Sequence, residues 1–307
     1  MSAVQSAGPL PAWFQDYLAL GADRPGLLKS VLQDAGIKVR AVELSGGLHL
    51  VATPPSMVRS EACRYKIITA HHDRVAGTPG ALDNSAANLQ LVRFLVSAQA
   101  AVNTAVIFTD HEELSGTVID RQGSYLLGTA LQRLGYQAPM VFSLDVTGRG
   151  DTLLLSSASD SLAGRDASFR GLALQVDDTA NQLRRLLGTR VPVRQARVPF
   201  GEDLGFLCAG VASLVLTVLP RREYEGLTGQ AFDGGAYGDN NSPGAPGGAA
   251  PALLPPWASL RAPGIPETWR YLHGAQDTPK LYTAEAFSLM ARVLQCLAEW
   301  RLPAYIG

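Results

Sequence analysis

The sequence is poor in cysteine and has no long apolar run. Its three cysteines, Cys63, Cys208 and Cys296, are far apart and lie in or beside apolar segments, which argues against a disulfide framework and predicts buried free thiols. No apolar stretch approaches the ~20 residues that a membrane-spanning helix needs. Residues 1–11 lack a basic start followed by an apolar core, so we expect no secretory signal and a protein of the reducing cytoplasm.

An excess of charge of either sign is also missing. The 26 basic residues balance 27 acidic ones, which gives a formal net charge of -1, and the basic residues form no run. This composition argues against a nucleic-acid partner. The sequence also lacks the Gly-x-Ser-x-Gly motif, which disfavours a serine hydrolase. We expect neither nucleic acid nor a membrane as a partner, and assembly into a homo-oligomer stays open.

What the sequence does have is enough apolar content for a large core. Of its 307 residues, 47% are hydrophobic, and the mean hydropathy is +0.07. These values favour a single catalytic domain over residues 1–307. The segment at about 221–266 differs from the rest, because residues 234–266 are crowded with glycine, proline, alanine and asparagine. We expect a loop or lid there.

Three short apolar runs are each followed by side chains that can bind a metal ion. The runs are residues 66–70, 104–109 and 140–144, and the side chains after them are His71, the pair Glu112 and Glu113, and Asp145. The runs are rich in β-branched or aromatic residues, as in buried parallel strands, and helix-like segments alternate with them. This alternation predicts an α/β layered domain. Ligands bind beyond the carboxyl ends of such strands, so we expect the three groups at one edge.

Other segments have clear helix or strand patterns. Strands are predicted at residues 38–44, 48–52, 152–156 and 214–219, and helices at 26–34, 86–97, 125–134, 178–187 and 283–300.

Five stretches together hold the side chains that a two-metal hydrolytic site needs. Such a site uses a bridging carboxylate, terminal histidine and carboxylate ligands, and one further carboxylate that moves protons. The stretches are His71-His72-Asp73, Asp83-Asn84, Glu112-Glu113, Asp145, and His273 with Asp277-Thr278.

In their order and spacing, these stretches resemble the M28 family of di-zinc aminopeptidases, which is related to the glutaminyl cyclases. Gly80-Ala81, Gly123-Ser124 and Asp277-Thr278-Pro279 add to the likeness, which covers about residues 64–300. The resemblance implies a three-layer α/β/α fold with a mixed, mostly parallel central sheet, as in zinc exopeptidases. It also implies two Zn²⁺ ions, with Mn²⁺ or Co²⁺ as alternatives, and a small peptide or aminoacyl substrate.

The resemblance also assigns roles to individual residues. Asp83 would bridge the two metals, His71 and Asp145 would complete one metal site, and Glu113 and His273 the other. Glu112 would transfer protons, Asp73 would orient His71, and Asp277 would be structural. Several of these residues also have an ordinary structural interpretation: His71 and His72 as a hydrogen-bonded pair, Asp83 as a helix cap, residues 110–113 as a solvated acidic loop, and His273 as a surface residue.

Some positions depart from the family pattern, and one of these departures lies where the substrate end is shaped. Where the family usually has Ser-Asp-His, this chain has Gly201-Glu202-Asp203. Glu202 is a candidate for binding a substrate's α-amino group, since a carboxylate pairs with an ammonium. A solvent-facing turn residue is the alternative.

The function that these residues together favour most is an aminopeptidase. A glutaminyl-cyclase-like aminoacyltransferase, a small-molecule amidase or deacylase, and a non-catalytic metal-stabilised binding protein remain as alternatives.

Overall fold

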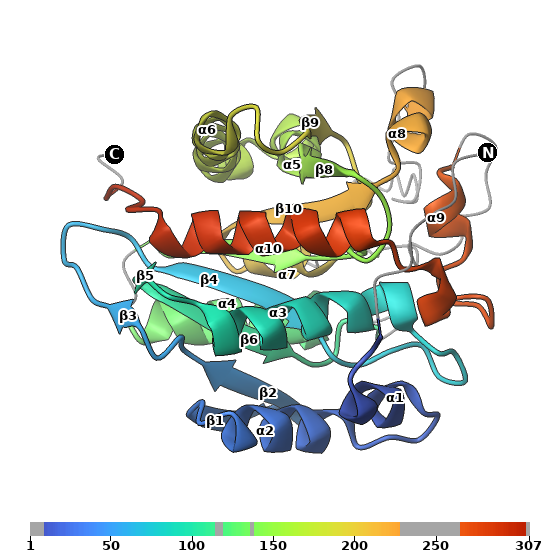
Figure 1. Cartoon of the computed structure of the whole chain (residues 1–307). Coiled ribbons are helices and arrows are strands. Elements are labelled where there is room, and N and C mark those ends of the chain that lie inside the picture. Colours follow the sequence, from blue (N-terminus) through green and yellow to red (C-terminus); the bar gives the residue numbers. More distant parts are fainter. Residues whose placement is uncertain (1–8, 114–118, 136–137, 228–264, 305–307) are drawn as a thin grey trace, which may run out of the picture.

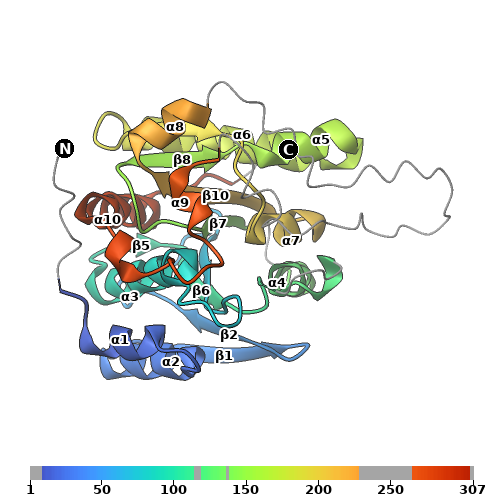
Figure 2. The same cartoon turned by 90° about the vertical axis from the view of Figure 1, so that its right-hand side faces the viewer.

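The computed structural model describes residues 9–113, 119–135, 138–227 and 265–304. In this part of the chain a central mixed sheet lies between two layers of helices (Figure 1, Figure 2). The three-layer α/β/α architecture predicted from the sequence is confirmed.

The central sheet has eight strands, and its middle is parallel. Across the sheet the order is β1 (Val39–Leu44), β2 (Gly47–Ala52), β6 (Thr104–Thr109), β4 (Lys66–His71), β7 (Met140–Leu144), β10 (Ala212–Leu219), β8 (Thr152–Ser156) and β9 (Val193–Ala196). Neighbours from β6 to β10 run parallel, whereas β2 and β8 are antiparallel to the strands inside them. The carboxyl ends of β6, β4 and β7 therefore lie side by side. A small separate sheet pairs β3 (Met57–Val58) with β5 (Ala101–Val102).

Helices cover both faces of this sheet. In Figure 1, α3 (Ala86–Ser97) and α10 (Ala284–Glu299) lie in front of the sheet, and α4 (Gly123–Arg133) and α7 (Glu202–Cys208) lie behind it. The front layer continues with α2 (Arg24–Asp34) beside α3 and with α6 (Arg170–Leu187) beside α10. The other α-helices of the described residues are α1 (Ala12–Leu18), α5 (Ala158–Arg165), α8 (Arg221–Leu227) and α9 (Glu267–Arg270).

Alternation along the strands divides the apolar side chains between two cores. Ile68 of β4 belongs to the larger core, under α2, α3, α6 and α10. Ile67 belongs to the smaller one, with Leu127 of α4 and Phe206 of α7. Because successive strand residues point to opposite faces and both faces are covered, all six residues of β4 are buried.

Most elements predicted from the sequence coincide with observed ones. The predicted strands at 104–109, 140–144 and 152–156 have the bounds of β6, β7 and β8, and the predicted helix at 86–97 has those of α3. The predicted helix at 178–187 is only the second half of α6, which begins at Arg170. Residues 221–227 of the predicted loop form α8, and residues 228–264 lie outside the described residues.

Two further predictions concern membrane-spanning helices and the three cysteine thiols. Along the described residues, no helix combines the length and the apolar character needed to cross a membrane. The three cysteines are free thiols, as predicted, but each is only partly buried. The predicted burial of these side chains is therefore only partial.

Candidate metal centre

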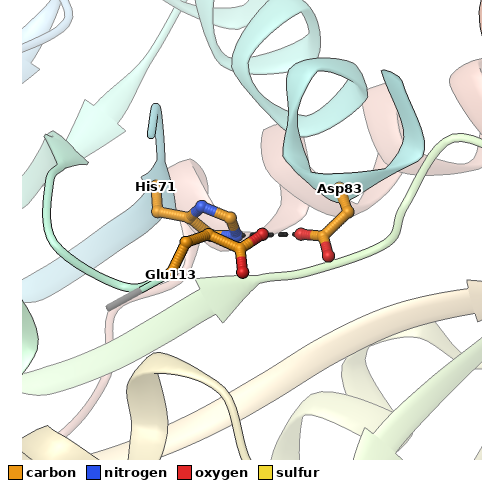
Figure 3. Close-up of side chains that lie close together, drawn as sticks. All are labelled: His71, Asp83 and Glu113. Carbon is orange, nitrogen blue, oxygen red and sulfur yellow. Dashed lines mark ion pairs between the residues drawn. The ribbon is translucent and has the colours of Figure 1, made fainter. Parts of the chain in front are cut away.

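Three predicted metal ligands meet at the carboxyl edge of the sheet. His71 is the last residue of β4, Glu113 follows β6, and Asp83 lies in an irregular turn, Ala81–Ser85, just before α3. One possible ligand atom from each of these residues lies within 4.8 Å of the others (Figure 3). Of the residues predicted to converge from strand ends, His71 and Glu113 are thus together in this group, which Asp83 completes from the turn.

Asp83 lies between the two histidines, with one carboxylate oxygen toward each. Oδ1 is 3.1 Å from Nε2 of His71, and Oδ2 is 2.9 Å from Nε2 of His273. The same nitrogen of His273 is 3.4 Å from Oε2 of Glu113. His273 therefore joins the cluster although it is 190 residues beyond Asp83.

Hydrogen bonds to the turn hold Asp83 in this position. Asp277 accepts hydrogen bonds from the backbone N–H of Leu82 at 2.6 Å and of Asp83 at 3.3 Å. The Asn84 amide donates to the carbonyl of Leu144, at the end of β7, at 2.6 Å. The turn is thus attached both to the loop that follows His273 and to the sheet edge. The structural role predicted for Asp277 agrees with these contacts.

Asp73 contacts two of the ligand-bearing residues. Its Oδ1 is 3.4 Å from Nδ1 of His71, and its Oδ2 accepts a hydrogen bond from the backbone N–H of Glu113 at 2.9 Å. The backbone carbonyl of Asp73 is 3.3 Å from the same Nδ1. These two acceptors favour a proton on Nδ1 and so orient the imidazole with its Nε2 available to a metal. Asp73 can therefore orient His71, as the sequence analysis expects, and it also positions the segment that carries Glu113.

Asp145 and Glu112 lie on the side of the centre that faces α7. A Cβ atom added to Gly201, just before α7, would be 2.8 Å from Oδ2 of Asp145 and 3.7 Å from Oε1 of Glu112. The backbone at Gly201 thus lies beside both carboxylates, and a larger residue would displace that of Asp145. The sequence analysis did not predict this close approach of Gly201 to the site. The only signal in the sequence was its place beside Glu202, in a segment that departs from the family pattern.

Burial and mutual charge shift the pKa values of these groups strongly. Burial, and then the charge of neighbouring carboxylates, raises the pKa of Glu112 well above its usual range, although His71 opposes this shift. Burial and the charge of Asp83 raise the pKa of Asp145 to about 7. Burial alone would lower the pKa of His273, but hydrogen bonds to Asp83 and Glu113 outweigh it and raise the pKa to about 11. Strong shifts of this kind are characteristic of functional sites.

The donor set fits a metal ion. Among the described residues, Nε2 of His71, Oε1 of Glu113 and Oδ1 of Asp145 are buried and have no hydrogen-bond partner. Buried polar atoms without a partner cost free energy, so they call for a specific explanation. Imidazole nitrogen and carboxylate oxygen are the donors that Zn²⁺ binds in hydrolytic sites, and an ion bound to these atoms would satisfy them.

Glu202 lies close to the centre, but its carboxylate is already hydrogen-bonded to the sheet. The side chain is buried, and Oε2 accepts a hydrogen bond from the hydroxyl of Thr69 on β4 at 3.1 Å. Oε1 accepts from the hydroxyl of Thr109 on β6. Glu202 is therefore not a solvent-facing turn residue. Its predicted pairing with a substrate ammonium stays a prediction, and such pairing would have to compete with the two threonine hydroxyls.

His72 points away from the ligands, as expected from strand alternation. Its Nε2 is 2.7 Å from the carbonyl oxygen of Leu48 on β2, so this imidazole is hydrogen-bonded to the sheet instead of the centre.

The sequence analysis missed one further residue near the site, Arg24. The sequence Asp23-Arg24-Pro25 marks the start of a helix, but it does not show where the Arg24 side chain lies.

Comparisons with known proteins identify the family and the fold. Residues 55–296 match the family described as peptidase family M28. No curated protein matches the chain. Among solved structures, LapA aminopeptidase of Legionella pneumophila is similar, with a TM-score of 0.58 and 14% identity over 96% of this chain and 69% of that one. Glutaminyl cyclase of Tannerella forsythia has a TM-score of 0.58 and 16% identity over 94% and 97%, and that of Porphyromonas gingivalis 0.57 and 14% over 94% and 96%. At these identities the structural likeness shows the fold.

Proposed function

The chain belongs to peptidase family M28, and on this premise we propose that it is an aminopeptidase that removes N-terminal residues from peptides with two zinc ions. The observation that carries the proposal is the placement of Asp83, whose two carboxylate oxygens face two different imidazoles. A carboxylate that bridges two metal ions ~3.5–4 Å apart presents one oxygen to each of them.

The remaining ligands would divide between the two ions. His71 and Asp145 would share one ion with Oδ1 of Asp83, and His273 and Glu113 would share the other with Oδ2. Metal ions held this way polarise a substrate carbonyl and make water a stronger nucleophile at neutral pH. Mn²⁺ or Co²⁺ could take the same positions, because carboxylate oxygens outnumber imidazole nitrogens in this set.

Glu112 would carry the proton in the reaction. It is next to Glu113 in sequence, and its carboxylate lies, like that of Asp145, beside the backbone of Gly201. A carboxylate in this place can take a proton from the attacking water and then deliver it to the leaving amine. Asp73 would keep the His71 ring in position throughout, because it contacts Nδ1 and leaves Nε2 free for the metal.

The altered segment Gly201-Glu202-Asp203 bears on the choice of substrate. Glu202 is the candidate for recognising a free α-amino group, and the carboxylates around it would favour a cationic substrate end over a neutral one. A glutaminyl-cyclase-like reaction is the second candidate, because two of the similar structures are glutaminyl cyclases. As the resemblance implies, that reaction uses one metal and releases ammonia, so only one of the two imidazoles beside Asp83 would bind a metal.

A small substrate panel tests the proposal. The zinc-loaded protein is incubated with leucine p-nitroanilide, with its N-acetylated counterpart and with a glutaminyl peptide. We expect hydrolysis of the first, at least 100-fold less of the second because it lacks the ammonium, and no ammonia release from the third. Equal hydrolysis of the acetylated compound would indicate an amidase, and ammonia release a cyclase. No turnover of any substrate by the zinc-loaded protein would indicate a binding protein.

A further inference from the structure

Arg24 is a buried cation beside the metal centre. It is the first residue of α2, and only 4% of its surface is exposed. Its Nη1 donates a hydrogen bond to the backbone carbonyl of Asp73 at 3.2 Å, and its Nη2 donates to the hydroxyl of Ser85. These acceptors lie 49 and 61 residues away in sequence. One side chain thus joins two distant segments.

Both segments carry metal ligands. Asp73 follows His71 by two residues, and its carboxylate contacts the His71 ring and the backbone N–H of Glu113. Ser85 follows Asp83 by two residues and ends the turn that presents Asp83. Arg24 is therefore linked through Asp73 to His71 and Glu113, and through Ser85 to the turn that presents Asp83. The distance between His71 and Asp83 depends on how these two segments are held together.

The surroundings of Arg24 stabilise its charge without an ion pair. Its guanidinium lies over the ring of Tyr17 in α1, 4.2 Å from the ring centroid, which is a cation–π contact. Among the described residues, no carboxylate forms a salt bridge with it. Burying an unpaired cation is costly. The backbone carbonyl of Asp73, the hydroxyl of Ser85 and the face of the Tyr17 ring are the partners that offset part of that cost.

A second arginine, Arg74, links the end of α1 to the loop that follows β4. Arg74 donates from Nη1 to the carbonyls of Leu18 and Pro79, each at 3.0 Å, and from Nη2 to that of Ala19. These acceptors, all among the described residues, do not include Ser85, which Arg24 contacts. The helices α1 and α2 lie before residue 55, where the family match begins, so Arg24 lies outside the matched residues.

We propose that Arg24 is a positioning residue of the metal centre, which fixes segment 71–73 against segment 83–85 and thereby sets the affinity for metal ions. The proposal rests on the metal binding inferred above. Arginine suits this role because its planar guanidinium reaches two acceptors at once, which the single ammonium of lysine does not do with the same geometry.

The test measures zinc affinity directly. Metal-free protein competes with a chromogenic chelator for Zn²⁺ in the parent and in Arg24→Met, Arg24→Lys and Ser85→Ala. We expect Arg24→Met to weaken zinc binding about 10- to 100-fold, as is usual when a residue that orients a ligand is lost. Arg24→Lys keeps the charge but loses the planar geometry, and Ser85→Ala loses one acceptor; each should weaken binding about fivefold or more.

Arg74→Met is the matched control. It removes an arginine from the same interface between α1, α2 and the loop, but it leaves the link from Asp73 to Ser85 intact. We expect its zinc affinity to stay within about twofold of the parent. The visible absorption spectrum of the Co²⁺-loaded protein, which reports ligand geometry, should change in Arg24→Met and not in Arg74→Met.

Defined results would overturn the proposal. Zinc affinity of Arg24→Met within twofold of the parent would do so, as would equal losses in Arg24→Met and Arg74→Met, which would indicate general loosening. If Arg24→Met does not fold, unchanged affinity in both Arg24→Lys and Ser85→Ala decides against it. Because no substrate is used, a failure of the aminopeptidase assay leaves this test unaffected, and unchanged affinities count against Arg24 even if the parent hydrolyses peptides.

Discussion

Nε2 of His273 lies 2.9 Å from Oδ2 of Asp83, although 190 residues separate the two in sequence. His273 has a left-handed backbone conformation, with φ of 57°, which directs its ring into the site. Asp277, four residues later, accepts hydrogen bonds from the turn that holds Asp83. This relationship brings the late histidine to the early ligands and makes a shared metal centre geometrically feasible.

Changing Glu112 to Gln should abolish hydrolysis while metal binding persists. An amide of the same size cannot take a proton from water, so we expect kcat to fall by about 10³-fold. Metal content, measured by plasma mass spectrometry, should match the parent. Glu113→Gln is the comparison, because it removes a predicted ligand and should lower metal content as well as activity. Near-parent turnover in Glu112→Gln would show that another group moves the proton.

The two adjacent histidines should behave differently when each is replaced. His71→Ala removes a predicted ligand, so zinc affinity should fall by more than about 100-fold. His72→Gln loses a contact with the carbonyl of Leu48 on β2 but no ligand, so its affinity should stay within about threefold. Chelator competition on both variants measures the difference. Equal losses of affinity would mean that His71 has no special relation to the metal.

Asp73→Asn should weaken metal binding without removing a ligand. The amide cannot provide the charge that Asp73 places 3.4 Å from Nδ1 of His71, so we expect about a 10- to 100-fold loss of zinc affinity. At saturating zinc, part of the activity should return, because all predicted ligands are still present. The zinc dependence of the rate measures this recovery. A variant that stays inactive at every zinc concentration would instead assign Asp73 a direct part in the chemistry.

Stability should fall in mild acid because of His49. This histidine is buried on β2, and its Nδ1 accepts a hydrogen bond from the backbone N–H of Asp110. Burial and the charge of His72 lower its pKa from 6.5 to about 4. Between these values the unfolded chain binds a proton that the folded chain does not, so this contribution is complete above pH 6.5 and is lost as the pH falls toward 4. The full effect is about 3 kcal/mol.

Unfolding free energies of the parent and of His49→Gln at pH 7 and pH 5 check this prediction. The glutamine side chain does not titrate in this range, so the variant should lose less stability than the parent on acidification. The difference between the two proteins isolates His49 from the other acidic and basic groups. Identical pH dependence in both would contradict the assignment.

The strands around the site were predictable because local sequence determines them. β6, β7 and β8 are short apolar runs, and runs of this length favour strands that are buried in a sheet. The first half of α6 was missed because residues 170–177 are a mixture of polar and apolar side chains without a clear start signal. The short elements α5, α7 and β9 were also missed, because tertiary contacts more than local preference stabilise pieces of this length.

The site was only partly predictable for a related reason. His71, Asp83 and Glu113 could be proposed because they follow strands or open a helix, and parallel strands end at a common edge. The hydroxyl partners of Glu202, the reach of Arg24 and the close approach of Gly201 depend on packing between distant segments. No pattern within a single segment indicates such contacts, so they could not be predicted from the sequence.

The number of metal ions per chain tests the central claim most directly. Purified protein is dialysed against limiting zinc and then against metal-free buffer, and zinc and protein are quantified in the same sample. The account predicts two zinc ions per chain in the parent and about one in His273→Ala, which keeps the ligands of the other ion. A parent protein that retains no zinc, or a His273→Ala variant that binds as much as the parent, would contradict it.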